Sequence, residues 1–278
     1  MLMSTHSQRV NANGAPLALG AHTDLAILQL SGSLIEDRGD HLIIRTPTNP
    51  GFHWGNFVFV TDPERVDDAE HWVSVFAEAF PQARHRAVGL VTAPSSPAGA
   101  AAWRAAGLQI EHEDALSTSR LPTLRPLAEG YTVKELTTDE DWAQALDLHL
   151  DDEPDHLITD PRHRQFREGR LHARQALTAA GHAAFLGAFA GSRLVAELGI
   201  VDCGQGIARY QHVFTAPEHR RRGLTSHLLG VAARWASDRG CNRWVIVADA
   251  DSDASRLYQA CGFTDAERLT QAYRAPAP

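Results

Sequence analysis

Apolar positions along residues 131–278 follow two spacings, one typical of strands and one typical of helices. Continuous or alternating apolar runs predict strands at residues 131–136, 183–190, 193–202, 207–215 and 243–248, with closing strands within 263–274. Apolar residues three or four positions apart predict helices at 138–150, from Asp160 onward, at 223–239 and at 251–261. This order predicts a mixed α/β sheet with a pair of helices inserted after its first strand.

A second series of elements is predicted for the first part of the chain. Strands are expected at 41–45, 57–60, 87–91 and 108–116, and helices at 23–34, 62–80 and 97–107. In the middle helix, Asp62 and Pro63 suit the N-cap and the first helical position. Trp72, Phe76 and Phe80 then form a single apolar stripe along it.

The chain has 278 residues, which favours two domains over one. Residues 1–20 are polar and are predicted to form a flexible tail. Residues 119–130 contain two prolines and no periodicity, so they are predicted to link a domain at 21–118 to a domain at 131–278.

The composition excludes several classes of function. The formal net charge is -8, and Lys134 is the only lysine, so a basic face for nucleic acid or a membrane surface is not expected. No apolar stretch is long enough to predict a membrane span. Cys203, Cys241 and Cys261 lack metal-ligand spacing and are expected to be reduced thiols of a cytoplasmic protein without a bound metal.

The segment at 210–229 carries the clearest chemical signal. A strand leads through Pro217 into Arg220, Arg221, Arg222 and Gly223, and an apolar helix follows directly. A helix N-terminus offers unpaired N–H groups and a positive dipole end, which suit a diphosphate. A glycine lets the backbone approach the anion, and arginines add charged hydrogen bonds. The alternative is a solvated basic loop at a helix start.

This turn resembles the acyl-CoA-binding turn of the GNAT family of N-acetyltransferases, whose pattern is (Gln/Arg)-x-x-Gly-x-(Gly/Ala). Arg220 and Gly223 match the pattern, whereas Thr225 departs from its last position. A second element, at 251–263, is similar to the family pattern Asn-x-x-Ala-x-x-Leu-Tyr-x-x-x-Gly-Phe. It matches at Ala254, Leu257, Tyr258, Gly262 and Phe263, with Asp251 in place of the asparagine.

The resemblance covers residues 131–278 and implies the acyl-CoA N-acyltransferase fold, an α/β (α+β) fold whose mixed, largely antiparallel central sheet is flanked by helices. It implies transfer of an acetyl group from acetyl-CoA, without a metal, to a primary amine of a small molecule or peptide by a monomer or homodimer. By resemblance, the coenzyme would contact Val213, Phe214, Thr215, Arg220, Arg221, Arg222, Gly223, Leu224, Thr225, Asp251, Ser255 and Tyr258.

The resemblance also implies candidates for proton transfer. Tyr258 matches the general acid that protonates the departing thiolate, although it could instead be a core aromatic with a bonded hydroxyl. Glu197 lies within an apolar strand, where burial would raise its pKa toward that of a base; the alternative is an ion pair with an arginine. On the next strand either His212 or Gln211 faces the cleft. The family also includes members without a dedicated base.

Substrate choice is expected to lie with the helix pair. The four carboxylates within Asp151–Asp155 could attract a cationic amine, or could simply form a solvated helix end.

The first half ends in a strand, a helix and a strand, an order that resembles the end of the second half. Residues 103–108 are similar to residues 258–263, but no Arg-x-x-Gly turn precedes them. A degenerate GNAT-like copy that has lost coenzyme binding is therefore predicted. The loop at 50–56 could reach toward an acceptor site or form an aromatic corner of the core. A different functional class is also possible for the whole chain: a non-catalytic acyl-CoA-binding sensor or scaffold.

Overall fold

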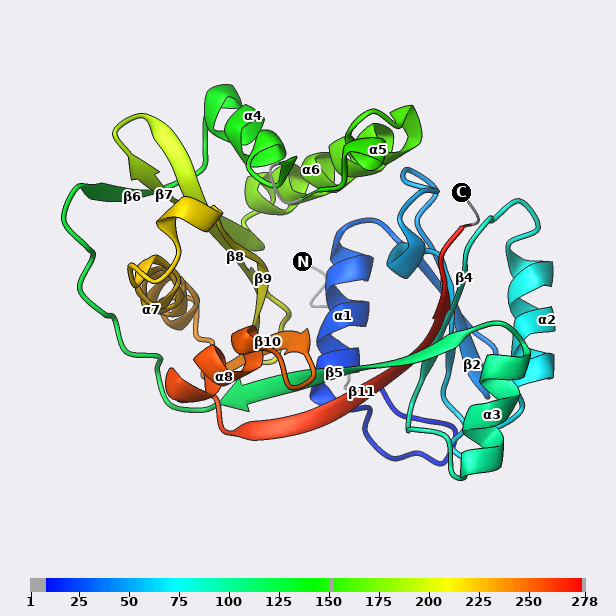
Figure 1. Cartoon of the computed structure of the whole chain (residues 1–278). Helices are drawn as coiled ribbons and strands as arrows, with labels where there is room; N and C mark the ends of the chain where they lie inside the picture. The colour runs from blue at the N-terminus through cyan, green and yellow to red at the C-terminus, as the bar shows by residue number, and fades with distance from the viewer. Residues whose placement is uncertain (1–8, 151–152, 277–278) are drawn as a thin grey trace. The chain divides into compact units, whose positions relative to one another are not determined.

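The computed structural model describes residues 9–150 and 153–276 (Figure 1). The chain forms two compact units. Unit 1 runs to Ala115 and also includes Val247–Ser255 and the chain from Ala266, whereas unit 2 comprises Leu116–Ile246 and Arg256–Asp265. The units are therefore not contiguous in sequence, unlike the predicted domains at 21–118 and 131–278. Residues 119–130 contain no helix or strand.

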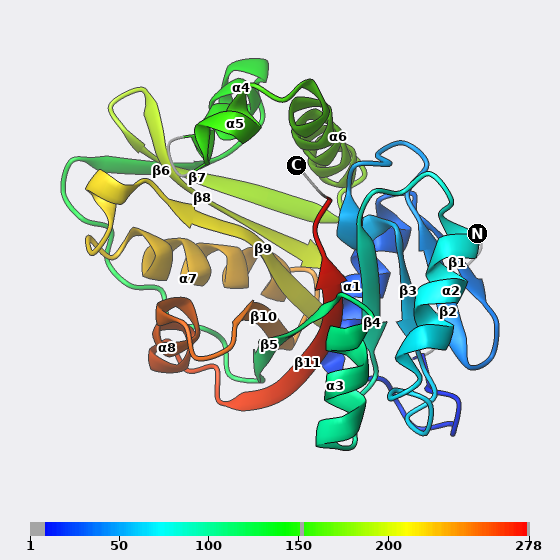
Figure 2. The ribbon, with the colours of Figure 1, turned by 45° about the vertical axis from the view of Figure 1, so that its right-hand side comes forward.

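Unit 1 is a sheet covered on both faces. Its strands follow the order β1-β2-β3-β4-β11-β5, and Figure 2 shows α1 on one face with α2 and α3 on the other. The elements are α1 (Leu19–Leu30), β1 (Leu34–Asp37), β2 (His41–Arg45), β3 (Phe57–Val60), α2 (Ala69–Ala79), β4 (Arg86–Leu90), α3 (Pro97–Ala105), β5 (Gln109–Thr118) and β11 (Asp265–Arg274).

Two predicted helix starts in unit 1 are wrong. The first helix begins at Leu19, where the Glu267 carboxylate accepts the N–H of Leu19 at 2.5 Å, and it ends before β1. The predicted tail at 1–20 therefore includes helical residues, while residues 1–8 lie outside the described residues. The helix expected from Asp62 begins at Ala69 instead, because Asp62 caps a turn by accepting the N–H of Glu64 at 2.9 Å.

The last strand is also placed differently from the prediction. Residues 263–274 were expected to close the sheet of the second half, but within unit 1 β11 pairs antiparallel with β4. The register joins Thr270 to Leu90 and Arg274 to Arg86. β11 is therefore a strand of the unit 1 sheet.

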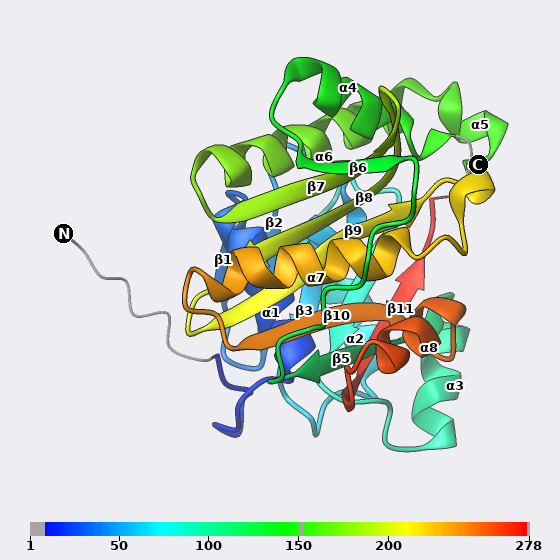
Figure 3. The same cartoon turned by 90° about the vertical axis from the view of Figure 1, so that its left-hand side faces the viewer.

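Unit 2 contains the predicted mixed and largely antiparallel sheet, in the order β10-β9-β8-β7-β6. Only β9 and β10 pair in parallel; the other three pairings are antiparallel. The elements are β6 (Tyr131–Glu135), α4 (Asp139–Asp147), α5 (Asp155–Ile158), α6 (Pro161–Ala179), β7 (Ala183–Ala190), β8 (Arg193–Asp202), β9 (Ile207–Thr215), α7 (Leu224–Ser237), β10 (Arg243–Asp249) and α8 (Asp253–Ala260). Figure 3 shows α7 lying along β7–β9, and α4 and α6 cover the opposite face.

Local chemistry explains where several of these helices begin. Thr138 and Asp141 form a reciprocal capping box at the start of α4, and Asp160 accepts the N–H of Arg162 at the start of α6. Gly230 allows the segment at 119–130 to lie against α7, since a Cβ there would come within 2.5 Å of the Leu124 Cα.

Among the described helices, none combines the length and apolar character that crossing a membrane requires.

Candidate active site

The strand β9 carries a bulge at the centre of the site. Its register with β8 joins Phe214 to Glu197 and Gln211 to Gly199, so that His212 and Val213 together face the single residue between them. His212 has a φ of 51°, a left-handed conformation that bulges accommodate. The bulge bends β9 beside Glu197.

Beyond its first residues β9 separates from β10. Their parallel pairing joins Arg243 to Ile207 and ends with Val245 opposite Arg209. Ala216 N–H donates to the Val195 carbonyl on β8 at 2.9 Å, so the alternation of the backbone turns the polar groups of Thr215 and Val213 toward the unpaired side. The end of β9 therefore offers main-chain groups that no neighbouring strand uses there.

The chain next forms a basic turn, which we define as residues 217–223. It contains two left-handed residues, Arg221 with φ 61° and Gly223 with φ 75°, and Gly223 is the N-cap of α7. The N–H groups from Arg221 to Ser226 donate to no described residue. The side chains of Arg220, Arg221 and Arg222 are exposed, whereas Leu224 is buried and contributes only its backbone. Exposed arginines and N–H groups of this kind are features that suit the binding of an anion.

Two residues, Arg220 of the basic turn and Thr225 of α7, contact the end of β9. Arg220 Nε donates to the Thr215 carbonyl at 3.0 Å, and its guanidinium carbon lies 5.9 Å from the Phe214 ring centroid. The hydroxyls of Thr215 and Thr225 are 3.1 Å apart. Thr225, which departs from the family pattern, thus links α7 to β9 through its hydroxyl.

Tyr258 lies on α8 and is 5% exposed. Burial, with Cys261 nearby, raises its pKa to about 12, and its hydroxyl makes no hydrogen bond to a described residue. The end of α8 lies close to the first turn of α7, since Cys261 Sγ is 3.8 Å from Ser226 Oγ. Tyr258 is therefore a protonated phenol without a hydrogen-bond partner among the described residues, on a helix beside the first turn of α7.

The other two predicted contacts on this segment are in unit 1. Ser255 is buried, and its hydroxyl donates to the Asp114 carboxylate at 3.4 Å. Asp251 precedes α8 in a left-handed conformation with φ 61° and is exposed. The Ser255 hydroxyl already has a partner, so its position is not that of an open ligand contact.

Glu197 is fully buried, and the expectation of a raised pKa is wrong. Arg174 Nη2 donates to its Oε2 at 2.5 Å, and His149 Nε2 lies 2.9 Å from its Oε1. Burial acts to raise the pKa of Glu197, but the charge of Arg174 and the contact with His149 outweigh it and hold the pKa below its usual value. Glu197 is an ionised partner of an arginine, which was the alternative expectation.

His212 lies in the same cluster. Arg170 Nη2 donates to His212 Nε2 at 3.2 Å. Burial lowers the pKa of His212 well below its usual value, and the nearby charges of Arg174 and Arg170 lower it further. His212 is therefore neutral, and the lone pair of its Nε2 is engaged. Gln211 is half-buried on the preceding position of β9.

His149 was not predicted as a site residue; it lies within the helix expected at 138–150 but beyond the end of α4 at Asp147. Its side chain is 29% exposed, and its ring centroid lies 4.3 Å from that of Phe214. The signal that could have found it is long-range: its partner Glu197 is 48 residues away in the sequence.

The acidic segment is only partly described. Asp151 and Asp152 lie outside the described residues, as does the side chain of Asp155. Glu153 lies 3.0 Å from His163 Nε2 and 3.7 Å from Arg167 Nε, both on α6. This carboxylate is therefore paired with the helix that follows it.

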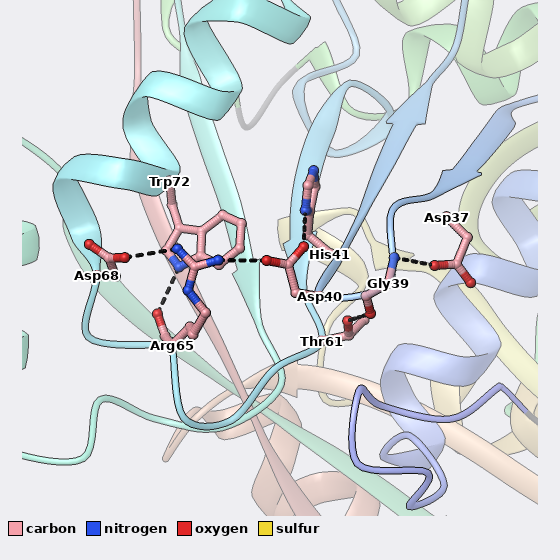
Figure 4. A network of polar contacts seen from close by, with 8 residues as sticks. All are labelled: Asp37, Gly39, Asp40, His41, Thr61, Arg65, Asp68 and Trp72. Carbon is pink, nitrogen blue, oxygen red and sulfur yellow. Dashed lines mark hydrogen bonds and ion pairs between the residues drawn. The ribbon is translucent and has the colours of Figure 1, made fainter.

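Among its described residues, unit 1 shows neither the separation of two neighbouring parallel strands nor the exposed arginines before a helix that are seen in unit 2. β3 pairs with β4 through Val60 and Leu90, and the Val91 N–H continues the pairing by donating to the Val60 carbonyl at 3.0 Å. Before α2, Figure 4 shows Arg65 held by two carboxylates, Asp40 at 2.6 Å and Asp68 at 3.0 Å, with its guanidinium over the Trp72 ring. The arginine there neutralises protein carboxylates, so it does not present a free charge to an anion.

The loop at 50–56 forms part of the core of unit 1. His53 stacks on His85 with ring centroids 4.1 Å apart, and its Nδ1 lies 2.7 Å from the Tyr273 hydroxyl. These contacts fit the aromatic corner that was one of the two expectations for this loop.

The described residues include no group of His, Cys, Asp and Glu side chains suited to a metal ion.

Residues 142–263 match the model of the acetyltransferase (GNAT) family. These residues form a GNAT-family domain. The match includes β9, the basic turn and Tyr258. No curated protein matches the sequence.

Solved structures resemble the chain over both halves. A conserved protein of unknown function from Staphylococcus epidermidis has a TM-score of 0.68 at 13% identity, with 88% of this chain and 94% of the other covered. A GCN5-related N-acetyltransferase from Kribbella flavida has a TM-score of 0.62 at 16% identity, with 94% and 98% covered. A tandem GNAT protein from the clavulanic acid biosynthesis pathway has a TM-score of 0.54 at 15% identity, with 92% and 88% covered. At these identities the likeness shows the fold alone.

Proposed function

We propose that the GNAT domain transfers an acetyl group from acetyl-CoA to a primary amine of a small molecule or peptide. The observation that carries this proposal is the row of N–H groups from Arg221 to Ser226, before and at the start of α7, that donate to none of the described residues. Such a row, at the positive end of a helix dipole, binds a diphosphate. The family match supports an acetyltransferase.

The surrounding groups suit the rest of coenzyme A. The arginines of the basic turn supply positive charge for phosphate oxygens. The backbone groups of Val213 and the N–H of Thr215, which β10 does not pair with, suit the amides of the pantetheine arm, which would take the place of a neighbouring strand. A thioester extended along β9 would then lie near the bulge at His212.

Acetyl transfer requires a neutral amine and a proton for the departing sulfur. The amine nitrogen bonds to the thioester carbonyl carbon as the carbon–sulfur bond breaks, and the sulfur leaves as a thiolate. Tyr258 is the proposed proton donor to that thiolate. With a pKa of about 12 its phenol holds the proton at neutral pH, and no described residue competes for the hydroxyl.

Unit 1 should bind no coenzyme A, and we propose that it is a degenerate copy of the GNAT domain. Its β3 and β4 remain paired, and Arg65 is neutralised by Asp40 and Asp68. A full chain should accordingly bind one coenzyme A.

Thiol release from acetyl-CoA across a panel of amines tests the activity, with Tyr258→Phe beside the wild type. We expect turnover with at least one amine, and a loss of about 10²-fold or more in kcat for the variant with unchanged acetyl-CoA affinity. A wild type that binds acetyl-CoA but acetylates no amine would instead favour a non-catalytic acyl-CoA sensor. Equal kcat in both proteins would remove Tyr258 from the mechanism.

A further inference from the structure

We infer that His149 accepts the proton of the incoming amine, and that Glu197 holds its imidazole in the tautomer this requires. The inference rests on the proposed acetyl transfer and adds the base that the sequence left open. It assigns Glu197 a positioning role, because its carboxylate acts through the His149 ring.

The hydrogen bond between the two residues fixes the tautomer. Arg174 Nη2 lies 2.5 Å from Glu197 Oε2, which keeps the carboxylate ionised and able only to accept hydrogen bonds. The Nε2 of His149, 2.9 Å from Oε1, must then carry the proton. The lone pair is consequently on Nδ1, which makes no hydrogen bond to a described residue.

His149 lies on the face of β9 that the helix pair covers. Its ring packs against Phe214, whereas the neighbouring Thr215 directs its hydroxyl to Thr225 on α7. Adjacent side chains of a strand point to opposite faces. The first turn of α7 is thus on one face of β9, and His149 is on the other face, with the helix pair. An amine arriving from the helix pair would meet His149 as it reaches a thioester held along β9.

The neighbouring candidates are less suited to this task. Glu197 is fully buried and committed to Arg174, so it cannot reach a substrate. The Nε2 of His212 already accepts a hydrogen bond from Arg170. Among the three, only His149 has a ring-nitrogen lone pair that no described residue engages, and its side chain is partly exposed.

The proton balance is complete with the groups present. The ammonium loses one proton to Nδ1 of His149, and the resulting imidazolium is stabilised by the Glu197 carboxylate through Nε2–H. The neutral amine then attacks the thioester. Tyr258 protonates the departing thiolate, and solvent returns the proton to Tyr258 and removes the one on His149.

Charged groups face His149 from two elements, while the ring of His212 on β9 is neutral. Glu197 on β8 stabilises a proton accepted by His149, whereas the charge of Arg174 on α6 opposes it. Replacing Glu197 by glutamine leaves only the opposing charge of Arg174. The acidic limb of the kcat/KM profile should then move to lower pH, which a merely structural defect would not cause.

The experiment compares wild type, His149→Gln, Glu197→Gln and the control His172→Gln, which alters an exposed histidine of α6. Acetyl-CoA affinity is measured by calorimetry, and thiol release with the amine panel is measured against pH. We expect equal acetyl-CoA affinity in all four proteins. His149→Gln should lose about 10²- to 10⁴-fold in kcat together with the acidic limb, and His172→Gln should match the wild type. Glu197→Gln should shift the acidic limb to lower pH.

Two results would overturn the inference. These are a wild-type rate and pH profile for His149→Gln, and an unchanged acidic limb in folded Glu197→Gln. A wild type that does not bind acetyl-CoA, or that binds it but turns over no amine, would contradict the proposed function itself, so the two failures are distinguishable. Because His149 is partly exposed, its glutamine variant is expected to fold even if Glu197→Gln does not.

Discussion

Arg174 and Glu197 form a buried ion pair, with Nη2 2.5 Å from Oε2 and both side chains almost fully removed from solvent. The guanidinium also lies over the Phe185 ring, with its carbon 4.5 Å from the centroid. A charge without its partner is costly in such surroundings, whereas an apolar pair of similar volume is tolerated.

Arg174→Met should therefore lower the free energy of unfolding by about 3–5 kcal/mol, because it leaves the Glu197 carboxylate buried and unpaired. Adding Glu197→Gln should recover most of the loss. Urea denaturation of the two single variants and the double variant measures this coupling. Arg164→Met is the control, since Arg164 is 77% exposed in its pair with Glu168 and should change stability little. A loss in the double variant equal to the sum of the single losses would contradict the coupling.

Asp141→Asn should weaken the start of α4 in a pH-dependent manner. Burial acts to raise the pKa of Asp141, but Lys134 and the N–H groups of Thr138 and Thr137 lower it to about 2. Because the unfolded chain takes up the proton near 3.8 and the folded chain only near 2, the stabilisation is complete above about pH 4. It is lost as the pH falls from about 4 to about 2.

We expect Asp141→Asn to cost about 1–2 kcal/mol at pH 7 and almost nothing at pH 2. Urea denaturation at several pH values measures the difference, with Asp139→Asn as an exposed control in the same helical turn. A difference from wild type that stays constant down to pH 2 would rule out the charge of Asp141 as its source.

His53 should make unit 1 sensitive to mild acid. Burial and the adjacent His85 lower the pKa of His53 to about 4. Between about pH 6.5 and pH 4 the unfolded chain binds a proton that the folded chain does not, so stability should fall as the pH falls through this range. The loss attributable to His53 is about 2–3 kcal/mol. Thermal denaturation of His53→Gln should show a weaker pH dependence than that of wild type. The exposed control His71→Gln should retain the full dependence.

Gly230→Ala should destabilise unit 2 although alanine favours helices. A Cβ at this position would lie 2.5 Å from the Leu124 Cα and 2.9 Å from its nitrogen. These are backbone atoms, so the strain cannot be relieved by a side-chain rotation, and we expect a loss of about 1–3 kcal/mol. Ser237→Ala, in the last turn of the same helix, is the matched control. A more stable Gly230→Ala protein would mean that the segment at 119–130 does not pack against α7.

The sequence predicted much of unit 2 because its signals are local. β7, β8 and β9 begin and end at the predicted residues, and α6 begins at Pro161, next to the predicted start at Asp160. The basic turn was also recognisable, since a strand, arginines, a glycine and an apolar helix follow one another directly. Each of these features depends on neighbours within a few positions.

The errors arise where distant residues decide the structure. The chain before α2 is held in turns because the indoles of Trp72 and Trp103 donate to the carbonyls of Arg65 and Val66. β11 has the alternation of any strand, and nothing in it indicates β4 as a partner. The role of His149 likewise depends on Glu197, and that of Glu197 on Arg174. A one-dimensional pattern shows the strand around Glu197 but not the charges that face it.

Calorimetric titration of the full chain with coenzyme A tests the central claim most directly. We predict one saturable site per chain, weakened at least tenfold by Arg220→Ala and by Gly223→Val, which places a branched residue at a φ of 75°. Arg239→Ala is the control, because Arg239 stacks on Trp235 near the other end of α7 and should not affect binding. The absence of saturable binding, or wild-type affinity in both turn variants, would contradict the account.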